Sequence, residues 1–294
     1  MNKNLDYFEA FVWPFCEKDC LFCNEWWYGK RKFHSLEEFK KIIDKNNFSK
    51  VVLTWWEPMT NPKLDEYISY CKNKNIIISL VTAIDSKNYL QKIEQYIHAG
   101  LNEIMISLEW PEKIHDALIQ KKWAYKQIIE TLYYLNTLNN SQIKVIIHSN
   151  INAVNYKFLV NFIKHILNNF PCIFNYHLQM LEPFGSAYQN KKILFKSYSE
   201  LIEPIFKNID TIQSKHKIKF WRLPLCLVWK NNQSYISQTP QIFEEHNNQT
   251  ELAGYEWTKY QSNICKKCSK YKICDGFFDY YIKEYWTKEI IPFT

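Results

Sequence analysis

The chain has 294 residues, of which 47% are hydrophobic and 17% aromatic, so it can bury a large core and intrinsic disorder is excluded. Its net charge is +7, but the basic residues are scattered as on a solvated surface, which argues against a nucleic-acid partner. The chain lacks an apolar run of about 18 residues and begins without a signal-peptide pattern, so we expect a cytoplasmic protein with no membrane partner. There the nine cysteines are expected as thiols or metal ligands rather than disulfides.

Apolar, β-branched runs alternate with amphipathic segments about six times along the first two thirds of the chain. The expected strands are 7–12, 50–54, 75–81, 103–109, 143–149 and 173–181, and the expected helices are 35–44, 63–73, 86–99, 124–138 and 155–169. Such alternation predicts right-handed βαβ units around a parallel sheet. We therefore predict an α/β fold with a partial (β/α)6 TIM-type barrel.

The pattern changes after residue 195. A further helix is expected over 198–215, and Cys, Tyr and Lys then dominate to the end of the chain. We predict a barrel over residues 1–195, followed by a linking helix and a small Cys-rich module over 196–294.

Three cysteines, Cys16, Cys20 and Cys23, lie in the run CEKDCLFC directly after the first expected strand. Three thiolates on one loop can hold three irons of a 4Fe-4S cluster and leave the fourth iron open to a small molecule. A zinc site usually has four closed ligands, and no fourth Cys or His lies at zinc spacing nearby. The carboxyl end of a barrel strand is also where barrel enzymes place their chemistry.

This loop resembles that of the radical SAM superfamily, whose pattern CxxxCxΦC is matched by Cys16, Cys20, Phe22 and Cys23. The resemblance implies that the open iron chelates S-adenosylmethionine and that an electron cleaves it to a 5′-deoxyadenosyl radical. It also implies that Phe22 packs by the adenine, and that a flavodoxin or ferredoxin supplies the electron.

After the second strand, the family has Gly-Gly-Glu-Pro, where bare backbone lets the cofactor's methionine end approach and the Glu receives its amino group. This chain has Trp55, Trp56, Glu57 and Pro58 there. Two more tryptophans stand at places where the family has glycine, Trp110 in ISLEWPEKIHD and Trp286 in YIKEYW.

The composition suggests one cause for these departures. Average usage of roughly 7% predicts about 20 glycines, whereas the chain has 5 glycines and 11 tryptophans. We hypothesise that the source organism reads UGA as glycine and that the gene was translated here with UGA as tryptophan. Alternatively the tryptophans are genuine and the genome is AT-rich. Genuine indoles at 55 and 56 would crowd the cofactor and leave little or no cofactor cleavage.

Other strand ends carry polar residues that the resemblance places near the cofactor. Ser107 and Glu109 would reach the ribose or the sulfonium, His148 and Asn150 the ribose or the substrate, and Leu181 would contact the adenine through its backbone. The alternatives are a solvated strand-end carboxylate at Glu109 and an ordinary core histidine at His148. Cys71 and Cys172 lack partners at ligand spacing and are expected to be buried.

The C-terminal region carries a second cysteine group, CKKCSKYKIC, formed by Cys265, Cys268 and Cys274, with Cys226 upstream. Four cysteines can close the coordination of a 4Fe-4S cluster or of zinc. The spacing resembles the SPASM or twitch extension of radical SAM maturases, which carries an auxiliary 4Fe-4S cluster. The family's next cysteine would fall at Phe278, so one auxiliary cluster is expected, with Cys226 as its fourth ligand.

The resemblance implies an enzyme that abstracts hydrogen from a peptide or protein substrate. One alternative is a radical SAM enzyme acting on a small metabolite or cofactor precursor. Another is a non-catalytic iron-sulfur or zinc scaffold, which genuine Trp55 and Trp56 would favour.

Overall fold

The computed structural model describes residues 5–23, 33–109, 111–138, 142–228, 235, 242–246, 249–252, 259–260, 262–274, 276–285 and 290–292. Its main sheet has the strand order β7-β6-β5-β4-β3-β2-β1-β8-β9. The strands are β1 (Leu5–Phe11), β2 (Phe48–Thr54), β3 (Ile77–Thr82), β4 (Glu103–Ser107), β5 (Lys144–Ile151), β6 (Ile173–Met180), β7 (Ile218–Trp221), β8 (Ile242–His246) and β9 (Gln249–Leu252). All neighbouring pairs are parallel except β8 and β9, which are antiparallel.

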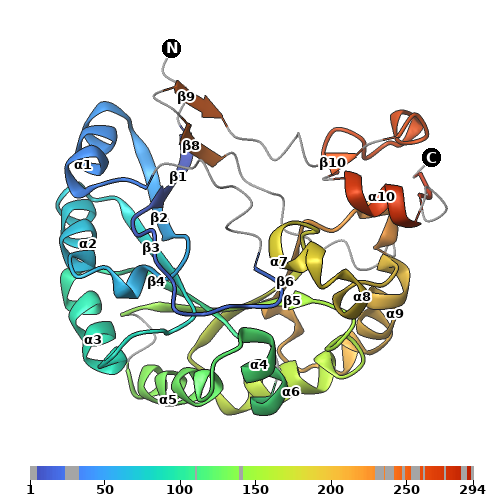
Figure 1. The fold of residues 1–294 in the computed structure, drawn as a ribbon, viewed down its shortest axis with the longest axis horizontal. Helices are drawn as coiled ribbons and strands as arrows, with labels where there is room; N and C mark the ends of the chain where they lie inside the picture. The colour runs from blue at the N-terminus through green and yellow to red at the C-terminus, as the bar shows by residue number, and fades with distance from the viewer. Residues whose placement is uncertain are drawn as a thin grey trace.

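Helices cover the outer face of this curved sheet, and α1, α2, α3, α5, α6 and α9 follow one another in an arc around it (Figure 1). The helices are α1 (Leu36–Lys45), α2 (Leu64–Asn73), α3 (Tyr89–Ala99), α4 (Glu112–Ile119), α5 (Ala124–Thr137), α6 (Leu159–Asn169), α7 (Gly185–Gln189), α8 (Lys191–Leu194), α9 (Tyr198–Asn208) and α10 (Asp279–Tyr285). This is the partial α/β barrel that the alternating pattern predicts. None of the described helices is long and apolar enough to cross a bilayer.

Both the strands and the helices follow from local sequence. Ile104 and Ile106 of β4 are fully buried, as expected for a parallel strand between helices and barrel interior. Helix α1 begins at a capping box, in which Ser35 and Glu38 each accept a hydrogen bond from the other's backbone N–H. Its Phe39 then packs into the core.

The observed barrel differs from the predicted one at its far edge. A seventh strand, β7, pairs with β6, so the parallel barrel strands exceed the predicted six. The helix expected over 198–215 ends at Asn208, because Asn208 Nδ2 donates to Pro204 O at 2.8 Å and Thr211 Oγ1 donates to Asn208 O. These side chains satisfy carbonyls that another helical turn would use. Helix α4 was not predicted.

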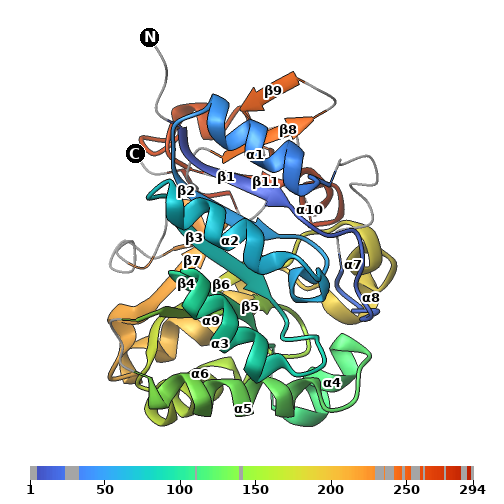
Figure 2. The same ribbon diagram turned by 90° about the vertical axis from the view of Figure 1, so that its left-hand side faces the viewer.

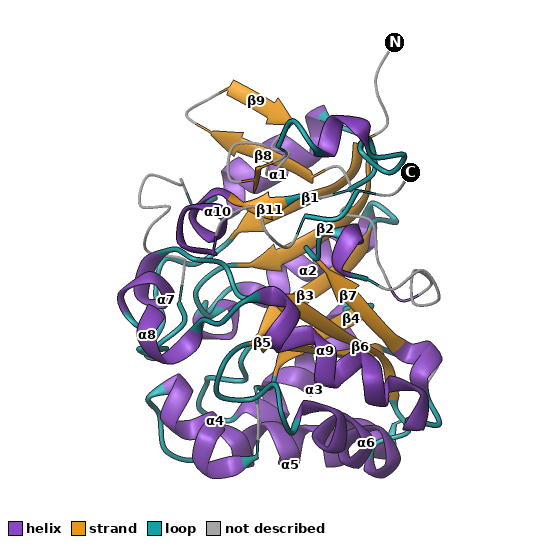
Figure 3. Ribbon diagram, turned by 90° about the vertical axis from the view of Figure 1, so that its right-hand side faces the viewer, coloured by secondary structure: helices purple, strands orange, loops and turns teal. Residues whose placement is uncertain are grey.

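The C-terminal segment packs beside the barrel's last helices (Figures 2 and 3). It contains a two-stranded antiparallel sheet, β10 (Lys259–Tyr260) with β11 (Phe277–Phe278), and helix α10. Tyr281 joins it to the barrel: its hydroxyl accepts a hydrogen bond from Tyr198 N at 2.7 Å, and the two rings lie 3.8 Å apart. The division of the chain between residues 195 and 196 stays a prediction.

Candidate functional site

The loop that carries Cys16, Cys20 and Cys23 follows β1 and lies at the carboxyl edge of the sheet. Other elements hold it in place by hydrogen bonds. Two attach its first half: Asn61 Nδ2 donates to Val12 O at 2.7 Å, and Glu57 N donates to Phe15 O at 3.2 Å. Three attach its second half: Leu21 N to Leu118 O at 2.9 Å, Asn190 Nδ2 to Leu21 O at 3.0 Å, and Ser186 N to Cys23 O at 2.8 Å. The loop is therefore positioned by strands and helices from far along the chain.

All three cysteines of this loop are half-buried residues. Burial raises the pKa of Cys20 and of Cys16, so their thiolates need compensation by positive charge. Thiolates are the soft ligands that iron-sulfur clusters use, and three of them on one loop fit such a cluster. Within the residues that the structure describes, no three Cys, His, Asp or Glu side chains are grouped to hold a single metal ion.

Glu57 connects the ends of β2 and β3 beside this loop. Its carboxylate is fully buried and accepts three hydrogen bonds, from Met59 N at 3.1 Å, Thr82 Oγ1 at 2.6 Å and Ala83 N at 2.9 Å. Burial raises the pKa of Glu57, while the charge of Lys18 and these donors lower it. Through these bonds Glu57 links the segment after β2 to the end of β3. Its predicted contact with a cofactor amino group stays a prediction. Pro58, which follows it, is buried.

Glu109 lies after β4 and is also fully buried. Asn150 donates to both carboxylate oxygens, from its backbone N at 2.9 Å and from Nδ2 at 3.2 Å. Burial raises the pKa of Glu109 to about 8 despite these bonds. The structure thus brings Glu109 and Asn150 together and excludes the solvated carboxylate considered as the alternative.

Ser107 and His148 are paired in the register of β4 and β5. The side chain of Ser107 is half-buried. Nδ1 of His148 is buried and has no hydrogen-bond partner among the described residues. Burial, and secondarily the charge of Arg222, lower the pKa of His148 to about 4, so the ring is neutral at physiological pH. A buried ring nitrogen without a partner among the described residues is unusual in a core histidine. The predicted contact of His148 with the ribose or the substrate stays a prediction.

The two residues expected near the adenine also meet. Phe22 packs against a small hydrophobic cluster formed by Leu118, Leu181, Ala187 and Leu194. This hydrophobic cluster lies beside Cys23, because the N–H of Ser186, next to Ala187, donates a hydrogen bond to the Cys23 carbonyl. An apolar wall of this kind suits a flat ring.

Trp55 and Trp56 lie between the end of β2 and Glu57. The Trp55 ring packs edge-on against Phe11 with centroids 4.4 Å apart, and Trp56 is 40% exposed. Because Glu57 N is bonded to Phe15 O, this pair adjoins the loop that carries Cys16. Trp110 and Trp286, the other two predicted glycine positions, lie outside the described residues.

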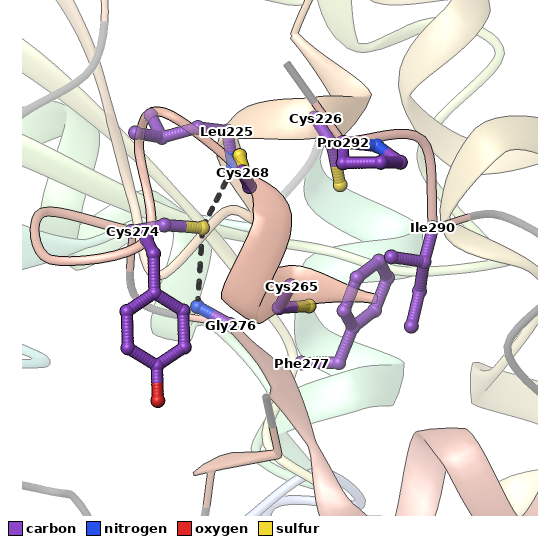
Figure 4. Close-up of a pocket in the computed structure, with 10 residues that line it drawn as sticks. Leu225, Cys226, Cys265, Cys268, Cys274, Gly276, Phe277, Ile290 and Pro292 are labelled. Carbon is purple, nitrogen blue, oxygen red and sulfur yellow. Dashed lines mark hydrogen bonds between the residues drawn. The ribbon is translucent and has the colours of Figure 1, made fainter. Parts of the chain in front are cut away.

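The four C-terminal cysteines surround one pocket of about 350 Å³, including its open mouth (Figure 4). Cys226 comes from the segment after β7, and the other three come from the loop before β11. The sulfurs are set among Leu225, Phe277, Ile290 and Pro292. Burial raises the pKa of Cys226 to about 11, and the nearby Cys274 and Cys265 add to this shift. Cys71 and Cys172, in contrast, are buried in the main core, as expected.

Backbone N–H groups in this pocket are directed at sulfur. Cys274 Sγ accepts from Leu225 N at 3.3 Å and from Gly276 N at 3.4 Å (Figure 4). Cys268 Sγ accepts from Lys270 N at 3.4 Å. Such donors stabilise thiolates, and hydrogen bonds to sulfur tune iron-sulfur clusters.

Sequence reasoning missed two residues of the site. Lys18 lies between the first two cysteines, and its Nζ donates to Ala83 O at 2.6 Å. Its charge opposes the burial effect on Cys16, Cys20 and Glu57. Asn155 donates from Nδ2 to Asn150 O at 2.7 Å and so fixes the turn after β5. The several Asn residues over 150–155 could have pointed to Asn155. A single Lys such as Lys18 forms no sequence pattern that could have pointed to it.

The chain resembles known proteins in sequence and in fold. The "Probable GTP 3',8-cyclase" of Methanococcus maripaludis is 32% identical over 117 residues, which cover 37% of this chain but only 38% of that protein. Streptococcus suis SuiB bound to precursor peptide SuiA has a TM-score of 0.69 at 12% identity, covering 98% of this chain and 75% of that one. Another SuiB structure is covered over 49% of its length, at a TM-score of 0.58, 16% identity and 74% of this chain.

A third structure, native anSMEcpe with bound AdoMet and Cp18Cys peptide, has a TM-score of 0.63 at 11% identity, covering 98% of this chain and 95% of that one. At such identities these likenesses establish the fold alone. The model of the radical SAM superfamily matches residues 11–163, which include the three-cysteine loop and strands β2 to β5. The match extends over more than half of the chain, which therefore belongs to the radical SAM superfamily of enzymes.

Proposed function

We propose that the chain holds a 4Fe-4S cluster on Cys16, Cys20 and Cys23 and binds S-adenosylmethionine beside it at the carboxyl edge of the sheet. The supporting observation is that five hydrogen bonds to three other parts of the chain fix the three-cysteine loop at this edge. When bound, the cluster and S-adenosylmethionine supply a 5′-deoxyadenosyl radical, which abstracts a hydrogen atom from the substrate.

The chain's own residues bind and orient the cofactor in this proposal. Phe22 and the backbone at Leu181 hold the adenine, since both belong to the apolar wall beside Cys23. Glu57 holds the segment after β2 against the carboxyl end of β3, and Thr82 orients its carboxylate. Glu109, oriented by Asn150, faces the ribose or the sulfonium.

The second part of the proposal concerns the C-terminal pocket. Cys226, Cys265, Cys268 and Cys274 hold an auxiliary 4Fe-4S cluster in a SPASM or twitch-like module. The support is the shared pocket and the N–H donors directed at Cys268 and Cys274. Structural zinc is the competing occupant.

We infer that the substrate is a peptide or protein. Two of the similar structures, SuiB and anSMEcpe, contain bound peptides, and their fold matches 98% of this chain. A small-molecule substrate is the second candidate, favoured by the sequence likeness to a nucleotide cyclase. A flavodoxin or ferredoxin serves as the electron donor, and we propose a cytoplasmic location.

Anaerobic reconstitution with iron and sulfide tests the cluster assignments. We expect two clusters' worth of iron in the unaltered protein, and one in Cys20→Ser and in Cys265→Ala. Cys172→Ala is the matched control, because Cys172 is buried in the main core and belongs to neither cysteine group, and it should keep both clusters. If Cys265→Ala kept the iron content of the unaltered protein and lost one zinc per chain, the C-terminal site would be a zinc site and the auxiliary cluster would be refuted.

The cofactor assignment has its own readout. The spectrum of the reduced N-terminal cluster should change when S-adenosylmethionine is added, and this change should disappear in Cys20→Ser but persist in Cys265→Ala. Formation of 5′-deoxyadenosine is then assayed with candidate peptides and small molecules, using the Trp55→Gly/Trp56→Gly protein. If the spectrum of the reconstituted protein did not change when S-adenosylmethionine is added, the proposed function would be refuted.

A further inference from the structure

Three tryptophans have the backbone conformation of glycine. Trp55, Trp56 and Trp123 have φ values of 76°, 46° and 71°, in the left-handed region. The structure describes five tryptophans, and the other two, Trp13 and Trp221, do not have positive φ. The described glycines, Gly100, Gly185 and Gly276, all have positive φ.

Other residue types enter this region far more rarely in the described chain. The remaining non-glycine cases are Asn75, Ile84, Asn88, Gln120 and Arg222. Two of them are Asn, which tolerates the left-handed region because its short side chain can bond to the local backbone. Positive φ thus occurs in most described tryptophans and in only five residues of all other non-glycine types. Nothing in an indole favours this conformation, and its Cβ makes it costly.

Position 123 shows the conformation without any packing that would require the indole. Trp123 precedes α5 as its N-cap, a place that favours Ser, Thr, Asp, Asn or Gly. Asp116 holds the turn, accepting from Trp123 N at 2.7 Å and from Tyr125 N at 2.9 Å. The indole itself is 62% exposed, with the Lys126 ammonium 5.6 Å from its ring. The backbone, rather than the side chain, defines this site.

Positions 55 and 56 show the same conformation twice in succession. They connect the end of β2 to Glu57, whose backbone N–H and carboxylate are both used in hydrogen bonds. This path obliges residues 55 and 56 to adopt left-handed φ values, which glycine adopts about as readily as negative ones. Glycine there would also leave bare backbone next to the loop of Cys16.

We infer that positions 55, 56 and 123 are glycine positions, and that the organism that makes this protein decodes their UGA codons as glycine. Position 123 adds independent support, since no motif singled it out and its conformation alone identifies it. The shortage of glycine beside an excess of tryptophan agrees with this. The inference about position 123 is independent of the proposed function, whereas the gain of cofactor access at 55 and 56 rests on it.

Thermal unfolding of paired variants tests the backbone argument. Trp123→Gly and Trp123→Ala both remove the indole and its Lys126 contact, and they differ only in tolerance of positive φ. We expect Trp123→Gly to unfold about 2 to 4 °C above Trp123→Ala. The matched pair Trp221→Gly and Trp221→Ala should show the opposite order, because Trp221 is in strand β7 with an ordinary φ. If those variants do not fold, the Trp13 pair replaces them.

An Ala variant at 123 at least as stable as the Gly variant would overturn the backbone argument. The decoding is tested by mass spectrometry of the peptides that contain residues 55, 56 and 123, from protein isolated from its natural source. Glycine is expected at all three, and tryptophan at all three overturns the inference. These results are separable from the proposed function: natural glycine in a protein that ignores S-adenosylmethionine would refute the function and leave the inference standing.

Discussion

Glu57 offers the sharpest test of how the cofactor loops are held. In Glu57→Ala, Met59 N and Thr82 Oγ1 lose their acceptor in a fully buried environment, and Ala83 N loses one at a half-buried position. An unsatisfied buried donor costs about 1 to 3 kcal/mol. Two buried donors therefore predict about 2 to 6 kcal/mol of lost stability. Burial of the carboxylate itself is unfavourable, as its raised pKa indicates, so the lower half of that range, about 2 to 4 kcal/mol, is expected.

The assay is urea unfolding followed by circular dichroism. Glu57→Gln keeps one acceptor oxygen for Thr82 and Met59 but presents an amide to Ala83 N, so we expect a smaller loss of about 1 to 2 kcal/mol. Glu94→Ala serves as the control, because Glu94 is exposed on α3, and it should stay within about 0.5 kcal/mol of the parent. If Glu57→Ala lost less than about 1 kcal/mol, the reasoning from buried donors would be refuted.

The partner of this carboxylate provides a second check. Thr82→Val removes one donor, and combined with Glu57→Ala, which removes the acceptor, it closes a double-mutant cycle. Because the Thr82 hydroxyl is 2.6 Å from Glu57 Oε1 in a buried site, a coupling of about 0.5 to 3 kcal/mol is expected. Strictly additive losses would show that the hydrogen bond contributes nothing.

Three further predictions concern other buried groups. The pKa of Glu109, raised by burial to about 8, means that the folded protein binds a proton that the unfolded chain releases near 4.5, so stability should fall as pH rises between these values. Glu109→Gln should flatten that fall in urea titrations, and an unchanged slope would contradict the shift. The pKa of His148, lowered to about 4, predicts stability that rises with pH from about 4 to 6.5, and His148→Gln should reduce this rise, since the neutral ring is favoured in the fold. Tyr281→Phe removes the acceptor of the buried Tyr198 N–H and should cost about 1 to 3 kcal/mol, measured by urea denaturation, and no measurable loss would contradict this.

Much of the barrel could be predicted from local pattern alone. The strands 50–54 and 143–149 were recognisable because buried parallel strands are continuous apolar runs, and α1 because its Ser35 cap and apolar spacing are local signals. The three-cysteine loop was equally recognisable, since ligands on one loop are close in space whenever they are close in sequence. Strand β7 escaped prediction because four residues carry too short a pattern, and pairing with β6 is what makes them a strand.

The sequence by itself thus determined the α/β class and the two cysteine groups. It also led to the hypothesis that tryptophan stands at glycine positions. Only the tertiary structure decided that Glu57 braces two loops, that Glu109 is buried against Asn150, and that Cys226 lies in one pocket with cysteines about forty residues later in the chain. Only the tertiary structure also showed that Trp123 has the backbone conformation of glycine. Contacts between distant residues and backbone dihedrals depend on how the whole chain packs, and no local pattern encodes them.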